Sequence, residues 1–192
     1  MKVLIACEFS GRMREAYRLL GHDAWSCDLL PAEDASPYHI QGDVRPLLRE
    51  RWDQVVAHPS CTRLCNSGVR WLAERDLWGE MREACAFFLE CLGANADQVA
   101  VENPVMHGHA QALIGRGPDF TVQPWMFGDN FKKRTGWWVK GLPRLVPTSD
   151  LDGSTAAAEV HRASPGPDRW KLRSRTYPGM AAACAMQWGG WA

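Results

Sequence analysis

The feature that most constrains the fold of this chain is an alternation between short apolar runs and segments of helical period. Apolar runs of strand length stand at residues 2–7, 22–27, 54–57 and 98–101. Apolar side chains at helical spacing occupy residues 11–20 and again residues 76–92. Strands that alternate with helices build parallel sheets with helices on both faces. The sequence therefore predicts an α/β fold with a mostly parallel, doubly wound, Rossmann-like sheet.

The first helix has signals at both of its ends. Ser10 precedes the apolar stripe and is expected to be the N-cap of the helix over residues 11–20. Gly21 follows that stripe at the position where a C-terminal glycine commonly ends a helix. Both signals predict that this helix begins immediately after the first strand.

The last third of the chain departs from the alternation. Apolar segments near residues 120–127 and 136–139 are expected to pair antiparallel at one side of the sheet. Residues 148–168 are rich in Ser, Asp, Gly, Ala and Pro, which is typical of a mobile surface loop. A short helix is expected over residues 180–188. With 192 residues, the chain is expected to form one domain over 1–192.

The charge of the chain is balanced overall and uneven along its length. Lys and Arg number 22, and Asp and Glu also number 22. Residues 105–192 hold 11 of the basic residues but only 6 of the acidic ones. This half could face phosphate groups if its cations cluster in space, or it could carry scattered, solvated charge.

The cysteines indicate a reducing compartment. There are seven, an odd number without the spacing of a disulfide framework, and no apolar signal segment leads the chain. No apolar segment approaches the length of a membrane span. We therefore expect a cytoplasmic protein, which for a phage-encoded chain means the cytoplasm of the host cell, with no membrane partner.

The residues that carry chemistry follow two neighbouring strands. Residues 53–68, DQVVAHPSCTRLCNSG, hold a buried run that ends in a polar, glycine-closed loop. Such a loop lies at the carboxyl edge of a parallel sheet, where ligands bind, so Cys61 is a candidate nucleophile. Glu102 ends the next strand and is expected to face the same ligand. A thiolate that adds to C6 of cytosine or uracil makes C5 nucleophilic, provided that an acid polarises the ring.

Two further expectations concern this pair of residues. We expect burial to raise the pKa of Glu102, so that its carboxylic acid can donate to ring N3. His58, Cys61 and Cys65 could instead hold zinc or iron, but no fourth ligand is apparent. No metal site is therefore expected.

In their order along the chain, these motifs resemble those of the catalytic domain of cytosine-C5 DNA methyltransferases, especially the small phage-encoded members. Residues 57–62, AHPSCT, resemble the Gly-Gly-Pro-Pro-Cys-Gln of the nucleophile motif, and residues 102–104 resemble its Glu-Asn-Val. Residues 130, 132 and 134 fall at the spacing of Gln-x-Arg-x-Arg. The resemblance implies catalytic roles for Cys61, Glu102 and Arg134. It further implies substrate-binding roles for Ser60, Asn66, Asn103, Lys132 and Lys133.

The same resemblance implies a cofactor. Residues 9–11, Phe-Ser-Gly, approach the family's Phe-x-Gly-x-Gly, with Met13 in place of the second glycine. An acidic residue follows the second strand, and residues 42–44 resemble the Gly-Asp-Ile that contacts adenine. A class I S-adenosylmethionine-dependent methyltransferase fold is implied. Its S-adenosylmethionine would be held by Phe9, Ser10, Gly11, Asp28, Asp43 and Pro59.

One part of the family pattern is missing, and its absence leaves the substrate open. Only about residues 142–171 stand where family members insert a sizeable target-recognition domain. Flipping a base out of a duplex requires many protein–DNA contacts, and a segment of this length provides few of them. DNA read with little sequence preference, single-stranded nucleic acid and a free cytosine nucleotide such as CMP or dCMP all remain candidate substrates. A catalytically silent nucleic-acid-binding protein and a transferase with another donor are the alternatives.

Overall fold

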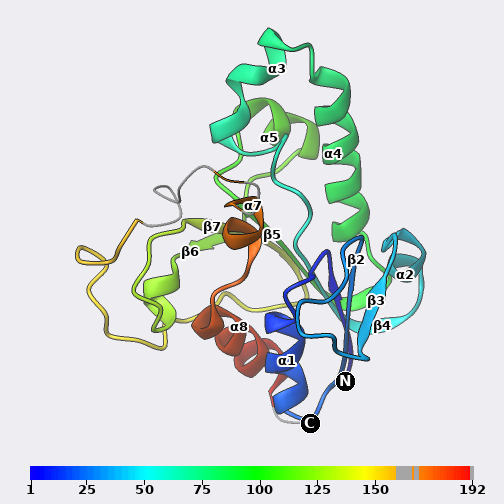
Figure 1. Ribbon diagram of the computed structural model, residues 1–192, viewed down its shortest axis with the longest axis vertical. Coiled ribbons are helices and arrows are strands. Elements are labelled where there is room, and N and C mark those ends of the chain that lie inside the picture. Colours follow the sequence, from blue (N-terminus) through cyan, green and yellow to red (C-terminus); the bar gives the residue numbers. More distant parts are fainter. Residues whose placement is uncertain (159–165, 167–168, 191–192) are drawn as a thin grey trace.

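A computed structural model describes residues 1–158, 166 and 169–190 of the chain (Figure 1). The described strands form one seven-stranded sheet with the order β3-β2-β1-β4-β5-β7-β6. Its strands are β1 (Lys2–Ala6), β2 (Asp23–Asp28), β3 (His39–Gln41), β4 (Trp52–Ala57), β5 (Ala96–Pro104), β6 (Phe120–Val122) and β7 (Thr135–Lys140). The first five strands run parallel, whereas β7 is antiparallel to both β5 and β6. The predicted mostly parallel α/β sheet is confirmed.

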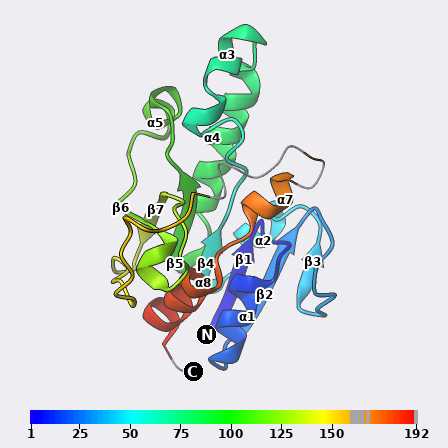
Figure 2. The same cartoon turned by 60° about the vertical axis from the view of Figure 1, so that its left-hand side comes forward.

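The helices lie on both faces of the sheet. They are α1 (Arg12–Leu19), α2 (Arg45–Arg49), α3 (Arg70–Glu74), α4 (Trp78–Leu92), α5 (Gly108–Ile114), α7 (Arg169–Ser174) and α8 (Pro178–Cys184). The described residues also form two 3₁₀ turns, η1 (Asn66–Gly68) and η2 (Pro124–Phe127), and one π-helical turn, η3 (Ala185–Gly189). Helices α1 and α8 cover one face, and α2, α4 and α5 cover the other. The upper ends of α3 and α4 extend beyond the sheet (Figures 1 and 2).

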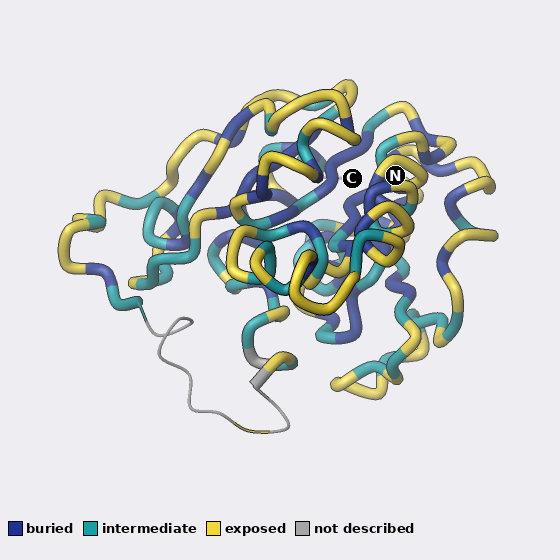
Figure 3. The backbone as a smooth tube through the Cα atoms, turned by 90° about the horizontal axis from the view of Figure 1, so that it is seen from above, coloured by how far each residue is buried: buried dark blue, intermediate teal, exposed yellow. Residues whose placement is uncertain are grey.

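The period-2 alternation of the strands divides the core into two clusters. Val3 and Ile5 of β1 pack with Met13 and Tyr17 of α1 on one face. Leu4 points to the opposite face, into the cluster that contains the side chains of α4. The buried residues lie at the centre of the molecule, and the exposed residues lie at its periphery (Figure 3). Because β1, β4 and β5 are covered on both faces, only their ends are accessible to a ligand.

The start of α1 differs from the sequence prediction. Gly11, not Ser10, is the N-cap, and its φ of 72° lies in the left-handed region that favours glycine. The carboxylate of buried Glu8 accepts hydrogen bonds from the amides of Met13 at 2.6 Å and Arg14 at 3.2 Å. The carboxyl group of Glu8, two residues after β1, thus supplies the acceptor that Ser10 was expected to provide. At the other end, the Gly21 amide donates to the carbonyl of Arg18, as predicted for a C-terminal glycine.

Several predicted elements are confirmed with shifted boundaries. Segment 120–127 pairs antiparallel with β7 only over β6, since η2 follows from Pro124. The predicted helix over 180–188 is α8 followed by the π-helical turn η3. Part of segment 148–168 lies outside the described residues. Within the described part, Ala157 forms a bridge with Phe131, and no helix or strand is present.

No helix in the described part of the chain is both long and apolar enough to cross a bilayer.

Candidate active site

The candidate site lies where the winding of the sheet reverses. Ala6, Ala57 and Val101 are in register across β1, β4 and β5. His58 directly follows β4, and Glu102 follows Val101 within β5, so the two residues stand side by side near the carboxyl edge, although β5 itself continues to Pro104. The order of strands reverses between β1 and β4, which is where ligands bind in doubly wound sheets.

His58 and Glu102 form a nearly buried pair. The Nδ1 of His58 lies 3.3 Å from Oε2 of Glu102, and their side chains are only 8% and 13% exposed. The imidazole also meets the ring of Trp137 edge to face, with the ring centroids 6.0 Å apart. Strand β7 thus contacts His58 through Trp137.

The ionisation of Glu102 is the reverse of what we expected from its burial. Burial raises the pKa of Glu102, but the hydrogen bond from His58 and the charge of Lys133 outweigh it. The pKa of Glu102 consequently lies below its usual value, and the expectation of a raised pKa was wrong. At neutral pH the side chain is a carboxylate, which accepts hydrogen bonds rather than donating one.

Cys61 lies in a loop held firmly to neighbouring elements. Its carbonyl accepts hydrogen bonds from the amides of Leu64 at 3.0 Å and Cys65 at 2.9 Å, which close one turn. The loop is anchored to the segment after β5, because the His107 amide donates to the Leu64 carbonyl at 3.0 Å. Gly68 closes the loop so tightly that a Cβ there would lie 2.8 Å from the carbonyl oxygen of Thr62. The half-buried Cys61 is therefore fixed in position.

The electrostatic surroundings of Cys61 connect it to the other candidates. A hydrogen bond with Cys65, then burial and the charge of Glu102, raise the pKa of Cys61, while Lys133 acts in the opposite direction. Cys61, Glu102 and Lys133 come from three segments that are distant in the sequence. The fold brings them close enough to influence one another.

A small pocket opens beside this group. Its lining residues are His58, Glu102, Lys133, Thr135, Trp137, Thr176, Tyr177 and Met180. Three buried polar atoms of this lining have no hydrogen-bond partner within the described residues, namely Nε2 of His58, Oε1 of Glu102 and Nε1 of Trp137. Each such atom costs about 1–3 kcal/mol when it stays unpaired. The cavity that these atoms surround is only about 10 Å³, the space of about one water molecule, so a pyrimidine ring would enter only if the lining moves.

The structure places the predicted cations differently. Lys133 lines the pocket, and its Nζ donates to the carbonyl of Arg173 at 3.0 Å. Arg134 is exposed and is not part of that lining. Lys132 points away, to the carbonyl of Ser154 at 3.1 Å. Lys133, one residue before the predicted Arg134, is thus the cation at the site.

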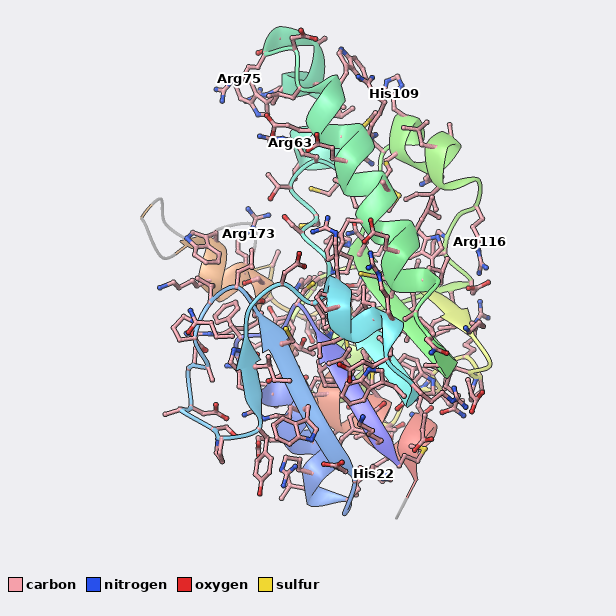
Figure 4. The ribbon with its side chains drawn as sticks, turned by 90° about the vertical axis from the view of Figure 1, so that its right-hand side faces the viewer. His22, Arg63, Arg75, His109, Arg116 and Arg173 are labelled. Carbon is pink, nitrogen blue, oxygen red and sulfur yellow. The ribbon has the colours of Figure 1, made fainter. Side chains whose placement is uncertain are left out.

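The remaining predicted substrate positions surround the pocket at a distance. Ser60 and Asn66 are exposed, and Ser60 Oγ donates to Oγ1 of Thr62 at 3.1 Å. Asn103 is fully buried on the face of β5 opposite to Glu102, and neither of its side-chain polar atoms has a partner among the described residues. Arg63, in the loop that follows β4, lies on the same side of the molecule as Arg75 and Arg173 in Figure 4.

The predicted cofactor positions lie at the ends of β1 and β2. Phe9 is buried, and its ring centroid lies 6.1 Å from that of Trp170 in α7. Asp28 ends β2, and burial raises its pKa although its Oδ1 accepts from the Leu30 amide at 3.0 Å. An aromatic ring, a left-handed glycine at Gly11 and a carboxylate suit the base and ribose of a nucleoside. These three positions fit S-adenosylmethionine.

Other predicted cofactor positions have local partners. Asp43 is exposed, and its carboxylate accepts from the amide of Arg45 at 3.0 Å and pairs with its guanidinium. This is a local turn contact just before α2, whose N-cap is Val44. Ser10 Oγ donates to Glu8 at 3.3 Å, and Pro59 is buried next to His58. The structure thus brings Phe9, Gly11 and Asp28 to the edge and shows Asp43 in a structural contact.

Sequence reasoning gave two neighbours of the nucleophile no part in catalysis. His58 and Cys65 were considered only as metal ligands, yet His58 holds Glu102 and Cys65 contacts Cys61. The position of His58 directly after a buried strand could have indicated from the sequence that it lies at the site. Within the described ranges, no group of three or more His, Cys, Asp or Glu side chains is arranged to hold a metal ion.

Comparison of the chain with known protein families and with curated proteins finds no match in either case.

Proposed function

We propose that this protein is an S-adenosylmethionine-dependent cytosine-C5 methyltransferase that acts through a covalent bond between Cys61 and C6. The observation that carries the proposal is that Cys61 lies within electrostatic reach of Glu102 and Lys133, which both line a pocket with unpaired polar atoms. The seven-stranded sheet, with β7 reversed, supports the class I methyltransferase fold that the resemblance implies. The motif order along the chain supports the same chemistry.

Cys61 and the residues of the pocket each act on a different part of the base. The Cys61 sulfur adds to C6, and the C5–C6 electron pair becomes available at C5. Oε1 of Glu102 accepts a hydrogen bond from the exocyclic amino group. N3 becomes more basic as the adduct forms, and once it has taken a proton from water it donates a hydrogen bond to the Glu102 carboxylate. Lys133, rather than Arg134, donates to the base carbonyl.

The cofactor would lie beside this pocket. When bound, S-adenosylmethionine supplies an electrophilic methyl group to C5. Phe9 and Gly11 would contact its nucleoside and methionine parts, and Asp28 would accept hydrogen bonds from the ribose hydroxyls. The C5 proton then leaves to a base, for which water is the proposed acceptor, and Cys61 is released.

One observation favours an alternative donor or a catalytically silent protein. The amides at the start of α1, which the resemblance places near the methionine end of the cofactor, are already bonded to Glu8. A cofactor carboxylate at that point would find those amides already occupied by the buried carboxyl group of Glu8. The alternative proposal is a methyltransferase-like protein that binds nucleic acid without methyl transfer, or that transfers another group.

Labelled S-adenosylmethionine separates these proposals. The protein is incubated with duplex DNA, single-stranded DNA, RNA, CMP or dCMP, and labelled nucleosides are identified by mass spectrometry. We expect 5-methylcytosine from one substrate class, no product from Cys61→Ser, and unchanged product from Cys85→Ala, which removes a core thiol of α4. Protein that binds the cofactor but labels no substrate would refute the methyltransferase proposal and favour the alternatives.

A further inference from the structure

The two ring nitrogens of His58 differ in their partners. Nδ1 lies 3.3 Å from Oε2 of Glu102, whereas Nε2 is buried and has no hydrogen-bond partner among the residues that the structure describes. Because the side chain is only 8% exposed, solvent replaces little of the missing bond. A buried polar atom without a partner is costly, so such atoms need an explanation. Since His58 lines the pocket, Nε2 is available to a molecule that enters there.

The partner of Nδ1 determines where the imidazole carries its hydrogen. Burial raises the pKa of Glu102, but the hydrogen bond from His58 and the charge of Lys133 bring it below its usual value. A carboxylate only accepts hydrogen bonds, so the shared hydrogen is on Nδ1. In the neutral imidazole the lone pair is then on Nε2. A carboxylate that fixes the tautomer in this way prepares the histidine of a catalytic triad to act as a general base.

The ionisable groups around His58 come from several elements. Glu102 of β5 holds Nδ1, Glu8 lies after β1 within electrostatic reach, and Lys133 and Tyr177 line the same pocket. The remaining lining residues have no ionisable side chain. Burial raises the pKa of Glu8, so Glu8 contributes less negative charge than Glu102. The Glu102 carboxylate therefore stabilises the positive charge that His58 gains when Nε2 accepts a proton.

We propose that His58 is a further catalytic residue, the general base to which the C5 proton passes through one water molecule. The inference rests on the proposed function, in which water is the first acceptor of that proton. The cavity that His58 lines has the space of about one water molecule. A general base can act through a single water. His58 is thus the group that makes this water basic enough to remove the proton.

The step balances without a further reactant. The C5–H bond breaks, its electron pair forms the C5–C6 double bond, and the bond between C6 and the Cys61 sulfur breaks. The water takes the C5 proton and gives one of its own protons to Nε2. Cys61 leaves as a thiolate, and His58 then releases its proton to solvent. Methyl transfer to C5 precedes this step, so the loss of His58 should slow the release of product and not the transfer itself.

His58→Asn separates the two nitrogens. The amide nitrogen of asparagine takes the position of Nδ1 and keeps a donor for Glu102, whereas the group at Nε2 is removed. Single-turnover methylation is followed with labelled S-adenosylmethionine and single-stranded DNA, or dCMP if only the nucleotide is methylated. We expect S-adenosylhomocysteine to form at nearly the wild-type rate, and 5-methylcytosine to be released about a hundredfold more slowly, within the range typical for loss of a general base.

The intermediate gives a second readout. In His58→Asn the methylated adduct on Cys61 should accumulate, and mass spectrometry of the intact, denatured protein detects it. His109→Asn is the matched control, because His109 is exposed and lies outside the pocket lining. In the wild type, the release rate should fall toward acid pH as Nε2 becomes protonated, and this acid limb should be absent in His58→Asn.

Three results would overturn the role of His58 and leave the proposed function intact. The first is product release from His58→Asn at the wild-type rate. The second is an equal loss in S-adenosylhomocysteine formation and in product release, which would show that His58 only positions Glu102. The third is a wild-type release rate that does not change toward acid pH, a result that does not depend on the folding of any variant. A wild type that forms no 5-methylcytosine would overturn both proposals.

Discussion

Replacing His58 by leucine removes the hydrogen-bond donor that keeps the buried Glu102 ionised. The two side chains are 8% and 13% exposed and 3.3 Å apart, so solvent does little to replace the lost partner. A hydrogen bond to a charged group contributes about 1.5–3 kcal/mol. The pKa of Glu102 should therefore rise in the variant, because burial then acts without the hydrogen bond that offsets it.

The change in pKa gives the stability of the variant a defined pH dependence. In the wild type the pKa of Glu102 lies below its unfolded value. Its ionised form therefore contributes stability above the unfolded pKa, and this contribution is lost as pH falls through the folded pKa. In His58→Leu, the hydrogen bond from His58 no longer offsets the effect of burial on the pKa of Glu102. The deficit relative to the wild type should be about 2 kcal/mol near neutral pH and should shrink in acid, where Glu102 is protonated in both proteins.

Urea unfolding of His58→Leu, Glu102→Gln and the double variant measures the coupling between the two positions. We expect the coupling energy to be about 2 kcal/mol near neutral pH and to fall as the pH drops below the usual range of a carboxyl group, where Glu102 becomes protonated. His109→Leu is the matched control, because His109 is exposed and lies outside the pocket lining. A coupling energy near zero at neutral pH, or one that does not change with pH, would refute the reasoning.

Two further predictions follow from positions in and near the site. Lys133→Ala should lower the methylation rate at saturating cofactor far more than Arg134→Ala, because only Lys133 lines the pocket; equal losses in the rate assay would restore Arg134 to the site. Gly68→Ala should displace the nucleophile loop, since its Cβ would lie 2.8 Å from a backbone oxygen. In thermal unfolding this variant should melt below the wild type, whereas Gly79→Ala, with nothing within 4 Å, should not.

The order of strands and helices was accessible from the sequence because it depends on local periodicity. The apolar runs at 54–57 and 98–101 became β4 and β5, and their register places His58 and Glu102 at one edge. The cap of α1 could not be predicted in this way. Ser10 has the residue type of a cap, but the acceptor is Glu8, which reaches back from the end of β1. Only the path of the backbone shows which of the two side chains meets the free amides.

The limits of the sequence prediction at the site have the same physical origin. The pKa of Glu102 depends on His58 and Lys133, which lie 44 and 31 positions away along the chain and meet Glu102 only in the fold. Motif spacing indicated Arg134, yet the turn into β7 directs Lys133 into the pocket instead. Side-chain direction alternates from one residue to the next, so an error of one residue reverses which side chain faces the ligand.

The lengths of the outermost strands bear on how this protein behaves at high concentration. In the described sheet, β3 and β6 form the two edges, and each has only three residues. A strand edge offers its free backbone groups to any other chain that approaches, and long flat edges nucleate aggregates. Edges as short as these present few such groups. The sheet should therefore resist edge-to-edge stacking. The protein molecules should then stay dispersed at high concentration.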